Sequence, residues 1–269
     1  MSVDQLISLD FAGIANDIIS ALEAYAREAG RRTYVMGLSG GVDSSVTAAL
    51  LTRAVGPENV VALIMPDSRV NSDEEVSMAV SLARELGIGH RVVFIDKIVD
   101  SFKDVLGDWG EGLAIGNVRA RIRMAVLYYF ANKLQGLVAG TSDKSELLIG
   151  YFTKYGDGAA DILPIGSLYK TQVRALGRYL GLPRDIVEKP SSPGLWPGHT
   201  AEGELGISYE EIDLVLYAFF DLGMGREEVL KFTGLRAEVV DKVMGMVKSS
   251  EHKRALPRLV RPRGLKPPY

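Results

Sequence analysis

The sequence predicts an α/β protein with a Rossmann-like open parallel sheet that carries helices on both faces. Short β-prone apolar runs alternate with helical patterns of about a dozen residues, which is typical of βαβ units. A glycine-rich turn follows the first apolar run, where open parallel sheets bind ligands. Of the 269 residues 47% are apolar, which is enough to bury a sizeable core and excludes a mainly disordered chain.

The first half of the chain supplies three strands and three helices of this fold. Apolar residues from Phe11 to Ala26 recur at helical spacing and predict an opening amphipathic helix. Ser72 and Glu75 form a capping box that begins a later helix. In order, we expect strands at 33–38, 60–65 and 91–95 and intervening helices at 43–54 and 73–86.

The second half adds a fourth buried strand and C-terminal helices. A glycine-rich link at 107–116 precedes a helix at 117–133 and a strand at 136–140. Residues 141–200 are rich in Gly, Pro and Ser, which predicts long functional loops around one helix at 171–180. Ser208 and Glu211 form a capping box, so we expect the acids Glu210, Glu211 and Asp213 to begin a helix rather than to catalyse. A last helix near 237–247 precedes a basic, proline-rich tail.

Composition excludes several classes of protein. The sequence has no cysteine, which excludes disulfides, thiolate zinc sites, iron–sulfur clusters and a Cys nucleophile. The formal net charge is -3, so no overall positive field would draw the protein to nucleic acid. The N-terminus has acids where a signal peptide needs a basic region, and no apolar run approaches the ~18 residues of a membrane span. We therefore expect a cytoplasmic protein with no nucleic acid and no membrane as partner.

The segment GLSGGVDSS, residues 37–45, is a candidate phosphate-binding loop. Gly40 and Gly41 permit a close approach of the backbone, so that successive N–H groups and the helix N-terminus can face an anion. Asp43 would repel a bare phosphate, but it becomes useful when a divalent cation lies between carboxylate and phosphates. The alternative is a plain glycine-rich turn with Asp43 as a capping acid. No Walker sequence GxxxxGK[ST] is present.

The SGGVDSS loop resembles the pyrophosphate loop of the N-type ATP pyrophosphatases, which cleave ATP to AMP and pyrophosphate while they activate a carboxylate or carbonyl as its adenylate. Four further segments resemble NAD synthetases in the same order, namely 117–124, 140–176, 189–206 and 251–253. The resemblance implies an adenine nucleotide alpha hydrolase-like fold. It also implies one NAD synthetase domain over residues 1–269, with an ATP pyrophosphatase core at about 30–190 and a C-terminal helical part and basic tail at 207–269.

The same resemblance implies the reaction. ATP and magnesium adenylate the nicotinate carboxylate of deamido-NAD, and ammonia then displaces AMP to give NAD. Family members that use glutamine carry a further amidase domain with a Cys nucleophile, and this chain has neither that length nor a cysteine. Free ammonia is therefore the expected donor, unless a separate amidotransferase subunit delivers it. The family also implies a homodimer.

The site residues follow from the resemblance, position by position. Magnesium would be bound by Asp43 and Glu146. Deamido-NAD would contact Arg121, Lys154, Asp161, His252 and Lys253. The ATP site would comprise Gly37, Leu38, Ser39, Gly40, Gly41, Val42, Asp43, Ser44, Thr141, Lys170 and Ser192. Lys170 lies near an expected helix start, where the helix dipole disfavours a cation, and this favours a catalytic role on the triphosphate over an ordinary exposed lysine.

Several residues keep two interpretations. Asp157 could bind ammonium and take its proton before attack, or it could be an ordinary turn aspartate. Tyr128 and Tyr151 could offer a flat surface to a ring, or they could belong to the core. Among the arginines of the 117–133 helix, 119 and 123 share one face, so we expect at least one of the helix arginines to be a plain solvent residue.

One loop departs from the family pattern. Where the family commonly shows PPSAGLW and GQTDE, this chain has PSSPGLW and GHTAE. His199 and Ala201 are the changed residues of the second motif, so the role of this loop and of Ser192 stays open.

Two rival functions belong to other classes. Another ATP pyrophosphatase, such as the synthetase half of GMP synthetase or a tRNA-modifying enzyme, would share the loop, although the absence of cysteine argues against sulfur-transferring or zinc-binding tRNA enzymes. The other rival is a nucleotide-binding module without turnover. The joint presence of Asp43, Glu146 and Lys170 argues against it, because a mere binder would not need the magnesium set.

Overall fold

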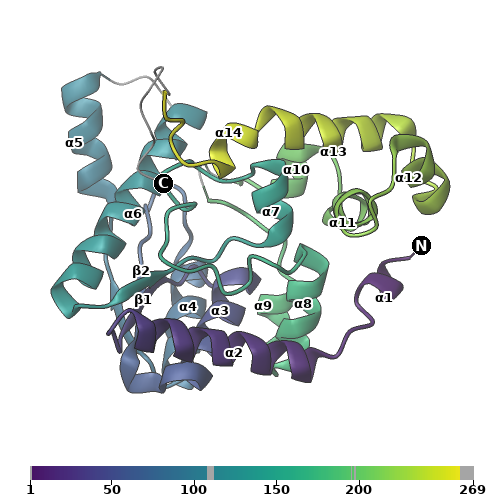
Figure 1. Cartoon of the computed structure of the whole chain (residues 1–269). Helices are drawn as coiled ribbons and strands as arrows, with labels where there is room; N and C mark the ends of the chain where they lie inside the picture. Colours follow the sequence, from purple (N-terminus) through teal and green to yellow (C-terminus); the bar gives the residue numbers. More distant parts are fainter. Residues whose placement is uncertain (1, 108–111, 195, 197, 261–269) are drawn as a thin grey trace.

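A four-stranded parallel sheet forms the centre of the molecule, as the sequence predicts (Figure 1). The computed structural model describes residues 2–107, 112–194, 196 and 198–260. The strands are β1 (Tyr34–Gly37), β2 (Val60–Ile64), β3 (Gly89–Val92) and β4 (Leu137–Ala139), in the order β3-β2-β1-β4. Tyr34 pairs with Val60 on one side and with Leu137 on the other.

The order of the strands determines where a ligand can bind. The chain runs from β1 outward through β2 to β3 and then returns to place β4 on the other side of β1. The direction of winding thus reverses between β1 and β4, and open parallel sheets bind ligands at the carboxyl ends of the strands at this point.

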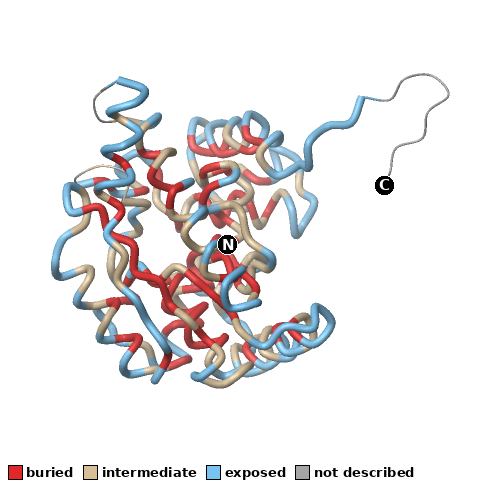
Figure 2. The backbone as a smooth tube through the Cα atoms, turned by 90° about the vertical axis from the view of Figure 1, so that its left-hand side faces the viewer, coloured by how far each residue is buried: buried red, intermediate tan, exposed pale blue. Residues whose placement is uncertain are grey.

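Both faces of the sheet are covered by helices. Alternate strand residues pack against one layer or the other, because successive side chains of a strand point to opposite faces. Tyr34, Met36 and Ala62 pack against α2 (Phe11–Glu28), α3 (Val42–Val55), α4 (Asp73–Glu85) and α8 (Lys170–Tyr179). Val35, Leu63 and Val138 pack against α5 (Asp96–Leu106) and α6 (Leu113–Leu134). Figure 2 shows the buried segments between exposed outer helices.

The C-terminal helices form a second apolar cluster beside the sheet. This cluster joins α11 (Tyr209–Phe220), α12 (Arg226–Thr233) and α13 (Ala237–Ser249) to α7 (Lys144–Ile149), α10 (Ala201–Leu205) and the short N-terminal α1 (Val3–Leu6). Two connecting turns are η1 (Pro57–Asn59) and α9 (Arg184–Val187), and α14 (Glu251–Arg254) ends the described helices. None of the helices in the described ranges is long and apolar enough to span a membrane.

The capping predictions are confirmed, with one difference. The Ser208 hydroxyl accepts a hydrogen bond from the Glu211 backbone N–H, and the Glu211 carboxylate accepts one from the Ser208 backbone N–H. Ser72 also caps its helix. The Glu75 carboxylate, however, accepts hydrogen bonds from Lys189 and Asn71 instead.

Some boundaries and elements differ from the sequence prediction. Helix α6 begins at Leu113, inside the expected glycine-rich link, because packing buries Gly116 within the helix despite its low helix propensity. Strand β3 covers 89–92 rather than 91–95, and α5, α7 and α12 were not predicted. Helix α7 lies in the expected loop region, where Asp143 and Glu146 form the capping box that begins it.

Candidate active site

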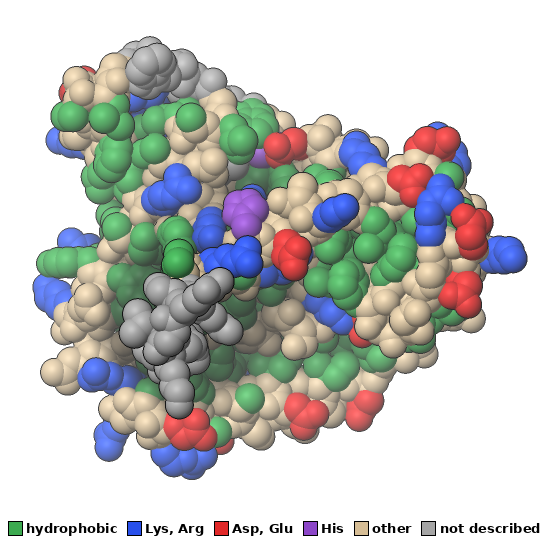
Figure 3. Space-filling model, turned by 45° about the horizontal axis from the view of Figure 1, so that its top comes forward, with side chains coloured by type: hydrophobic (Ala, Val, Ile, Leu, Met, Phe, Trp, Pro, Cys, Tyr) green, Lys and Arg blue, Asp and Glu red, His purple; other side chains and the backbone are tan. Residues whose placement is uncertain are grey.

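A cavity of about 620 Å³ lies at the carboxyl ends of β1 and β4. Its walls come from the loop after β1, from the segment after β2, from α6, and from the segments 139–142, 150–157 and 189–194. Further lining residues are Glu75, Val76, Glu146, Ala201, Glu204 and Lys253. Basic side chains gather on the upper face of the molecule, where α14 lies in Figure 1 (Figure 3).

The loop after β1 has the geometry of an anion site. Helix α3 begins at Val42 with Gly41 as its N-cap, so the first N–H groups of a 14-residue helix point towards the loop. The hydroxyls of Ser39 and Ser44 lie 3.1 Å apart, and the Ser39 N–H donates to the Ser44 Oγ at 3.2 Å. The cavity is lined by Gly37, Leu38, Ser39, Gly41, Val42, Asp43 and Ser44.

Gly40 has a backbone role. It adopts a φ of +78°, and a Cβ there would lie 3.2 Å from the Glu75 carbonyl oxygen of α4. Glycine at this position therefore permits both the left-handed turn and the close packing of the loop against α4. Gly40 is not among the lining residues, so its direct contact with ATP stays a prediction.

Three carboxylates meet at one side of the cavity. Asp43, Asp143 and Glu146 each offer an oxygen within 4.8 Å of the others. The buried Lys170 Nζ lies between them, 2.6 Å from Asp43 Oδ2, 2.8 Å from Glu146 Oε1 and 2.9 Å from Asp143 Oδ2. Asp43 Oδ1 is buried, and no described group donates a hydrogen bond to it.

The electrostatics of this cluster favour a divalent cation. Burial raises the pKa of Asp143 to about 6, although Lys170 opposes the shift. Burial likewise raises the pKa of Glu146 well above its ordinary value. For Lys170, burial alone would lower the pKa, but Asp143, Asp43 and Glu146 together raise it well above its ordinary value. Even with one ammonium among them, Asp143 and Glu146 ionise less readily than ordinary carboxyl groups, and a hard cation with oxygen ligands would supply further positive charge.

The predicted pair Asp43 and Glu146 is brought together, and the structure adds Asp143. Asp143 caps α7 by accepting a hydrogen bond from the Glu146 N–H at 2.8 Å. The D-x-x-E spacing of that capping box is visible in the sequence, but it indicates a helix start and not a metal ligand. Lys170 is fully buried among the carboxylates and is absent from the cavity lining, so a direct contact with the triphosphate stays a prediction.

Four predicted substrate residues lie along one rim, where α14 docks onto the 150–157 segment. Lys253 Nζ donates to the carbonyl oxygens of Gly150 and Phe152 at 2.8 and 2.9 Å. Lys154 Nζ donates to the His252 carbonyl at 2.6 Å, and the Arg121 guanidinium donates to the Lys154 carbonyl at 3.3 Å. Burial lowers the pKa of Lys253.

The contact between α7 and the start of α14 is close. Gly150 ends α7 with a φ of +71°, and a Cβ there would lie 2.0 Å from Ser250 Cβ. Arg254 then donates to the Leu148 carbonyl of α7 at 2.6 Å and to the Val247 carbonyl of α13 at 2.8 Å. We call this contact region, residues 147–154 against 247–254, the C-terminal seam.

Asp161 lies apart from that rim. Its Oδ2 accepts a hydrogen bond from the Val138 N–H of β4 at 2.7 Å, and its Oδ1 accepts one from the Tyr128 hydroxyl at 3.3 Å. Burial, followed by the charge of Asp161, raises the pKa of Tyr128 to about 12. Neither side chain lines the cavity, whereas Tyr151 does. A contact of Asp161 with substrate stays a prediction.

Asp157, Thr141 and Ser192 all line the cavity. Asp157 Oδ1 accepts a hydrogen bond from the Thr153 N–H at 2.9 Å, which is the turn geometry of the simpler interpretation. The carboxylate is nevertheless open to the cavity, and enclosure by the cavity walls raises its pKa. The structure is thus compatible with both interpretations.

The divergent loop carries a polar cluster. The buried His199 ring stacks on Trp196, with centroids 3.5 Å apart, and its Nε2 lies 2.8 Å from Glu204 Oε2. Tyr151 donates its hydroxyl proton to the same Glu204 oxygen at 2.6 Å. Ser192 donates to the His199 carbonyl, which closes the loop over the cavity wall. His199 therefore fixes the position of the loop that carries Ser192.

The arginines of α6 differ in their surroundings. Arg121 is the exposed one, whereas Arg119 is fully buried and pairs with Asp67 at 2.7 Å. Arg123 lines the cavity. The helical periodicity could not assign these positions, and Arg123 was not among the predicted site residues.

Comparison with known proteins shows which family the chain resembles. The family model described as NAD synthase matches residues 14–257. An NH(3)-dependent NAD(+) synthetase of Hyperthermus butylicus is 52% identical over 257 residues, which cover 96% of this chain and 93% of that protein.

Two solved structures resemble the chain over nearly its full length. An NMN synthetase from Francisella tularensis has a TM-score of 0.83 and 33% identity, covering 97% of this chain and all 100% of the other. An NH3-dependent NAD synthetase from Campylobacter jejuni has a TM-score of 0.81 and 31% identity, covering 94% and 100%.

Proposed function

The chain belongs to the NAD synthase family, and from that premise we propose how its cavity carries out the family reaction. The reaction is the ATP-dependent amidation of deamido-NAD with ammonia, which gives NAD, AMP and pyrophosphate. The enzyme is thus a ligase that forms a C–N bond. The observation that carries the site assignment is the meeting of an anion-binding loop and three carboxylates in one cavity at the switch point of the sheet.

Magnesium is the cation proposed for the carboxylate cluster. Asp43, Asp143 and Glu146 would hold it, and the orphaned Asp43 Oδ1 fits a missing cationic partner. When bound, magnesium neutralises the triphosphate and polarises the α-phosphate. Lys170 holds the three carboxyl groups close together through its ammonium contacts.

The ATP phosphates would lie against the loop after β1. The backbone N–H groups at the start of α3 and the hydroxyls of Ser39 and Ser44 face the charge that develops on the departing pyrophosphate. Thr141 and Ser192 line the same cavity and would contact the nucleoside part. A carboxylate is a poor acyl donor, so transfer of AMP to it supplies the leaving group that ammonia later displaces.

Deamido-NAD is assigned to the rim of the C-terminal seam. Arg121, Lys154, His252 and Lys253 gather there, and cations suit a ligand with a pyrophosphate and a free carboxylate. Asp161 lies apart from that rim and outside the cavity lining, and its contact with deamido-NAD is proposed from the family pattern alone.

Asp157 is proposed as the group that holds ammonium and takes its proton. Its carboxylate is open to the cavity, and its raised pKa suits a proton acceptor. Asp157→Asn should leave pyrophosphate release intact and slow amide formation. Single-turnover experiments that follow pyrophosphate and NAD separately would decide this, and an unchanged amidation rate would refute it.

A homodimer in the cytoplasm, without nucleic acid or membrane partners, is the proposed state of the enzyme. An exposed apolar face on and around α5 supports the dimer, since such faces commonly mark interfaces. Its side chains are 38 to 82% exposed: Phe94, Ile98, Phe102, Val105, Leu113 and Tyr129. We also propose the division of one domain over 1–269 into a core at 30–190 and a C-terminal part at 207–269.

The test is an assay of the purified protein with ATP, magnesium and ammonium that follows NAD, AMP and pyrophosphate together. Deamido-NAD should give equal amounts of all three products, and glutamine should not replace ammonium. A parallel reaction offers nicotinate mononucleotide, because one structural neighbour is an NMN synthetase. Faster turnover of the mononucleotide would overturn the dinucleotide assignment. ATP that binds but is never cleaved would instead indicate a binding module.

A further inference from the structure

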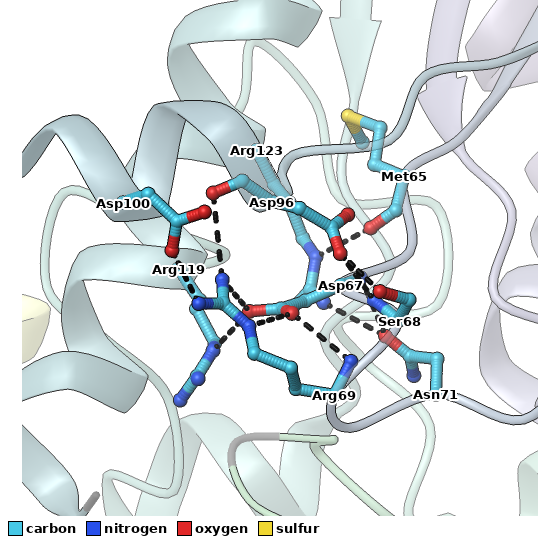
Figure 4. Close-up of polar contacts among 9 residues, drawn as sticks. All are labelled: Met65, Asp67, Ser68, Arg69, Asn71, Asp96, Asp100, Arg119 and Arg123. Carbon is cyan, nitrogen blue, oxygen red and sulfur yellow. Dashed lines mark hydrogen bonds and ion pairs between the residues drawn. The ribbon is translucent and has the colours of Figure 1, made fainter. Parts of the chain in front are cut away.

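Arg123 is a cavity-lining cation that no assigned role explains. Its Nε donates to the Met65 carbonyl at 3.0 Å, and an Nη donates to Asn71 Oδ1 at 3.2 Å. Both acceptors are neutral, and both belong to the segment after β2 that forms one wall of the cavity (Figure 4). Among the described residues, no carboxylate lies within ion-pair distance of Arg123.

One acid that acts on Arg123, Asp67, already has two other arginine partners. Figure 4 shows it between two other arginines, Arg119 at 2.7 Å and Arg69 at 2.8 Å. Burial would raise the pKa of Asp67, but the hydrogen bonds from Arg69 and Arg119 outweigh burial and hold it at about 2. Arg69 also pairs with Asp100. Asp67 thus pairs with Arg69 and Arg119 and forms no ion pair with Arg123.

Two other acids near Arg123 have partners of their own. Glu75 pairs with Lys189 at 2.9 Å, and Asp157 accepts a hydrogen bond from the Thr153 N–H. Their charges, with that of Asp67, only partly offset the burial that lowers the pKa of Arg123. Burying a cation without an anion is costly, so a protein retains such a group where a ligand supplies the missing charge.

We propose that Arg123 binds an anionic oxygen of a bound substrate, either an ATP phosphate or the nicotinate carboxylate of deamido-NAD. The planar guanidinium suits both groups, because it donates two parallel hydrogen bonds to a phosphate or a carboxylate. The inference rests on the proposed function, since it assigns the anion to a substrate. Arg123 lies on the α6 wall between Ala120 and Leu127, which also line the cavity, whereas Arg121 is exposed at the rim.

A purely structural role makes a different prediction. If Arg123 only ties α6 to the wall after β2, removal of one of its two acceptors should have a similar effect to removal of Arg123 itself. Asn71→Ala, which keeps the cation, should then lower ligand affinity about as much as Arg123→Met. If Arg123 binds an anion, Arg123→Met should do far more damage than Asn71→Ala. The affinity of Arg123→Lys should then lie between those of the wild type and Arg123→Met, because lysine keeps the charge but cannot donate two parallel hydrogen bonds.

The experiment measures the affinity of the full-length protein and these three variants for four ligands by calorimetry. The ligands form two matched pairs. ATP and adenosine differ in the phosphates, and deamido-NAD and NAD differ in the nicotinate carboxylate. Arg123→Met should lower the affinity for ATP or for deamido-NAD at least about tenfold, which is about 1.4 kcal/mol. Its affinity for the matched ligand that lacks the anion should stay unchanged. Thermal unfolding checks that each variant folds.

The pattern of loss identifies the anion. A loss confined to ATP assigns a phosphate, and a loss for deamido-NAD but not for NAD assigns the carboxylate. Affinities within about twofold of wild type, or equal losses for adenosine and ATP, would overturn the inference, as would equal losses in Asn71→Ala. Failure of the proposed function looks different, because the wild-type protein would then form no NAD from deamido-NAD.

Discussion

Gly150→Ala should displace α14 from the 150–154 segment at the C-terminal seam and weaken substrate binding without unfolding the protein. The added Cβ would lie 2.0 Å from Ser250 Cβ and 2.4 Å from Ser250 Oγ. Non-bonded carbons stay about 3.5 Å apart or more, so Ser250 and the α14 turn that follows must move by about 1.5 Å. The two hydrogen bonds from Lys253 to Gly150 and Phe152, at 2.8 and 2.9 Å, cannot survive that shift unchanged.

The size of the effect follows from those contacts. A hydrogen bond that involves a charged group contributes about 1.5–3 kcal/mol, which corresponds to roughly 10- to 100-fold in affinity. We therefore expect the KM for deamido-NAD to rise by at least about tenfold. The KM for ATP should change much less, because the hydrogen bonds of the seam join α14 to residues 147–154 and not to the loop after β1. The left-handed conformation adds a strain of roughly 1–2 kcal/mol, which lowers the melting temperature.

Two controls separate the clash from the strain. Gly181→Ala has the same kind of strain, with a φ of +81°, but no atom lies within 4 Å of its Cβ. It should lower stability and leave the KM for deamido-NAD unchanged. The double variant Gly150→Ala with Ser250→Gly removes the clashing Cβ and Oγ and should restore much of the KM, measured against Ser250→Gly alone. A double variant as impaired as Gly150→Ala would refute the steric argument.

Three further predictions concern charge and assembly. Asp143→Asn keeps the helix cap but removes a charge, so activity should need at least about tenfold more magnesium in a titration, and an unchanged requirement would exclude Asp143 as a ligand. Burial raises the pKa of Asp213 to about 7, above its value in the unfolded chain. The folded state therefore favours the protonated form, and the wild type should lose up to roughly 3 kcal/mol of unfolding free energy between pH 5 and 8. Urea unfolding of Asp213→Asn over the same pH range should show a smaller loss. Val105→Asp on α5, where Val105 is 82% exposed, should shift sedimentation towards the monomer, whereas Tyr179→Asp on α8 should not.

The strands and the anion-binding loop could be predicted because their signals are local. Each strand is a short apolar run between turn residues, and the glycines of the loop are contiguous in sequence. The arrangement around Lys170 could not be predicted in this way. Its ammonium contacts Asp43, which is 127 positions away, and only tertiary packing brings the two together.

The orientation of α6 was also beyond the sequence. Its buried positions include Gly116, Arg119 and Ile122, and apolar residues occur on all sides of the helix, so no polar face is defined. Residue spacing alone therefore could not show that Arg119 turns inward to Asp67 while Arg121 faces solvent. Asp143 was missed for another reason, because a capping residue and a metal ligand have the same appearance in a sequence.

The ammonium of Lys170 is an internal counter-ion for the carboxylate cluster proposed to bind magnesium. It lets the loop after β1 and the start of α7 assemble around three carboxylates before any cation arrives, since each of them already has an ammonium within 2.9 Å. The architecture of the site is therefore a property of the polypeptide, and metal binding completes a charge balance rather than a fold. On the proposed assignment, a cation could leave with its nucleotide while each carboxyl group keeps its contact with Lys170.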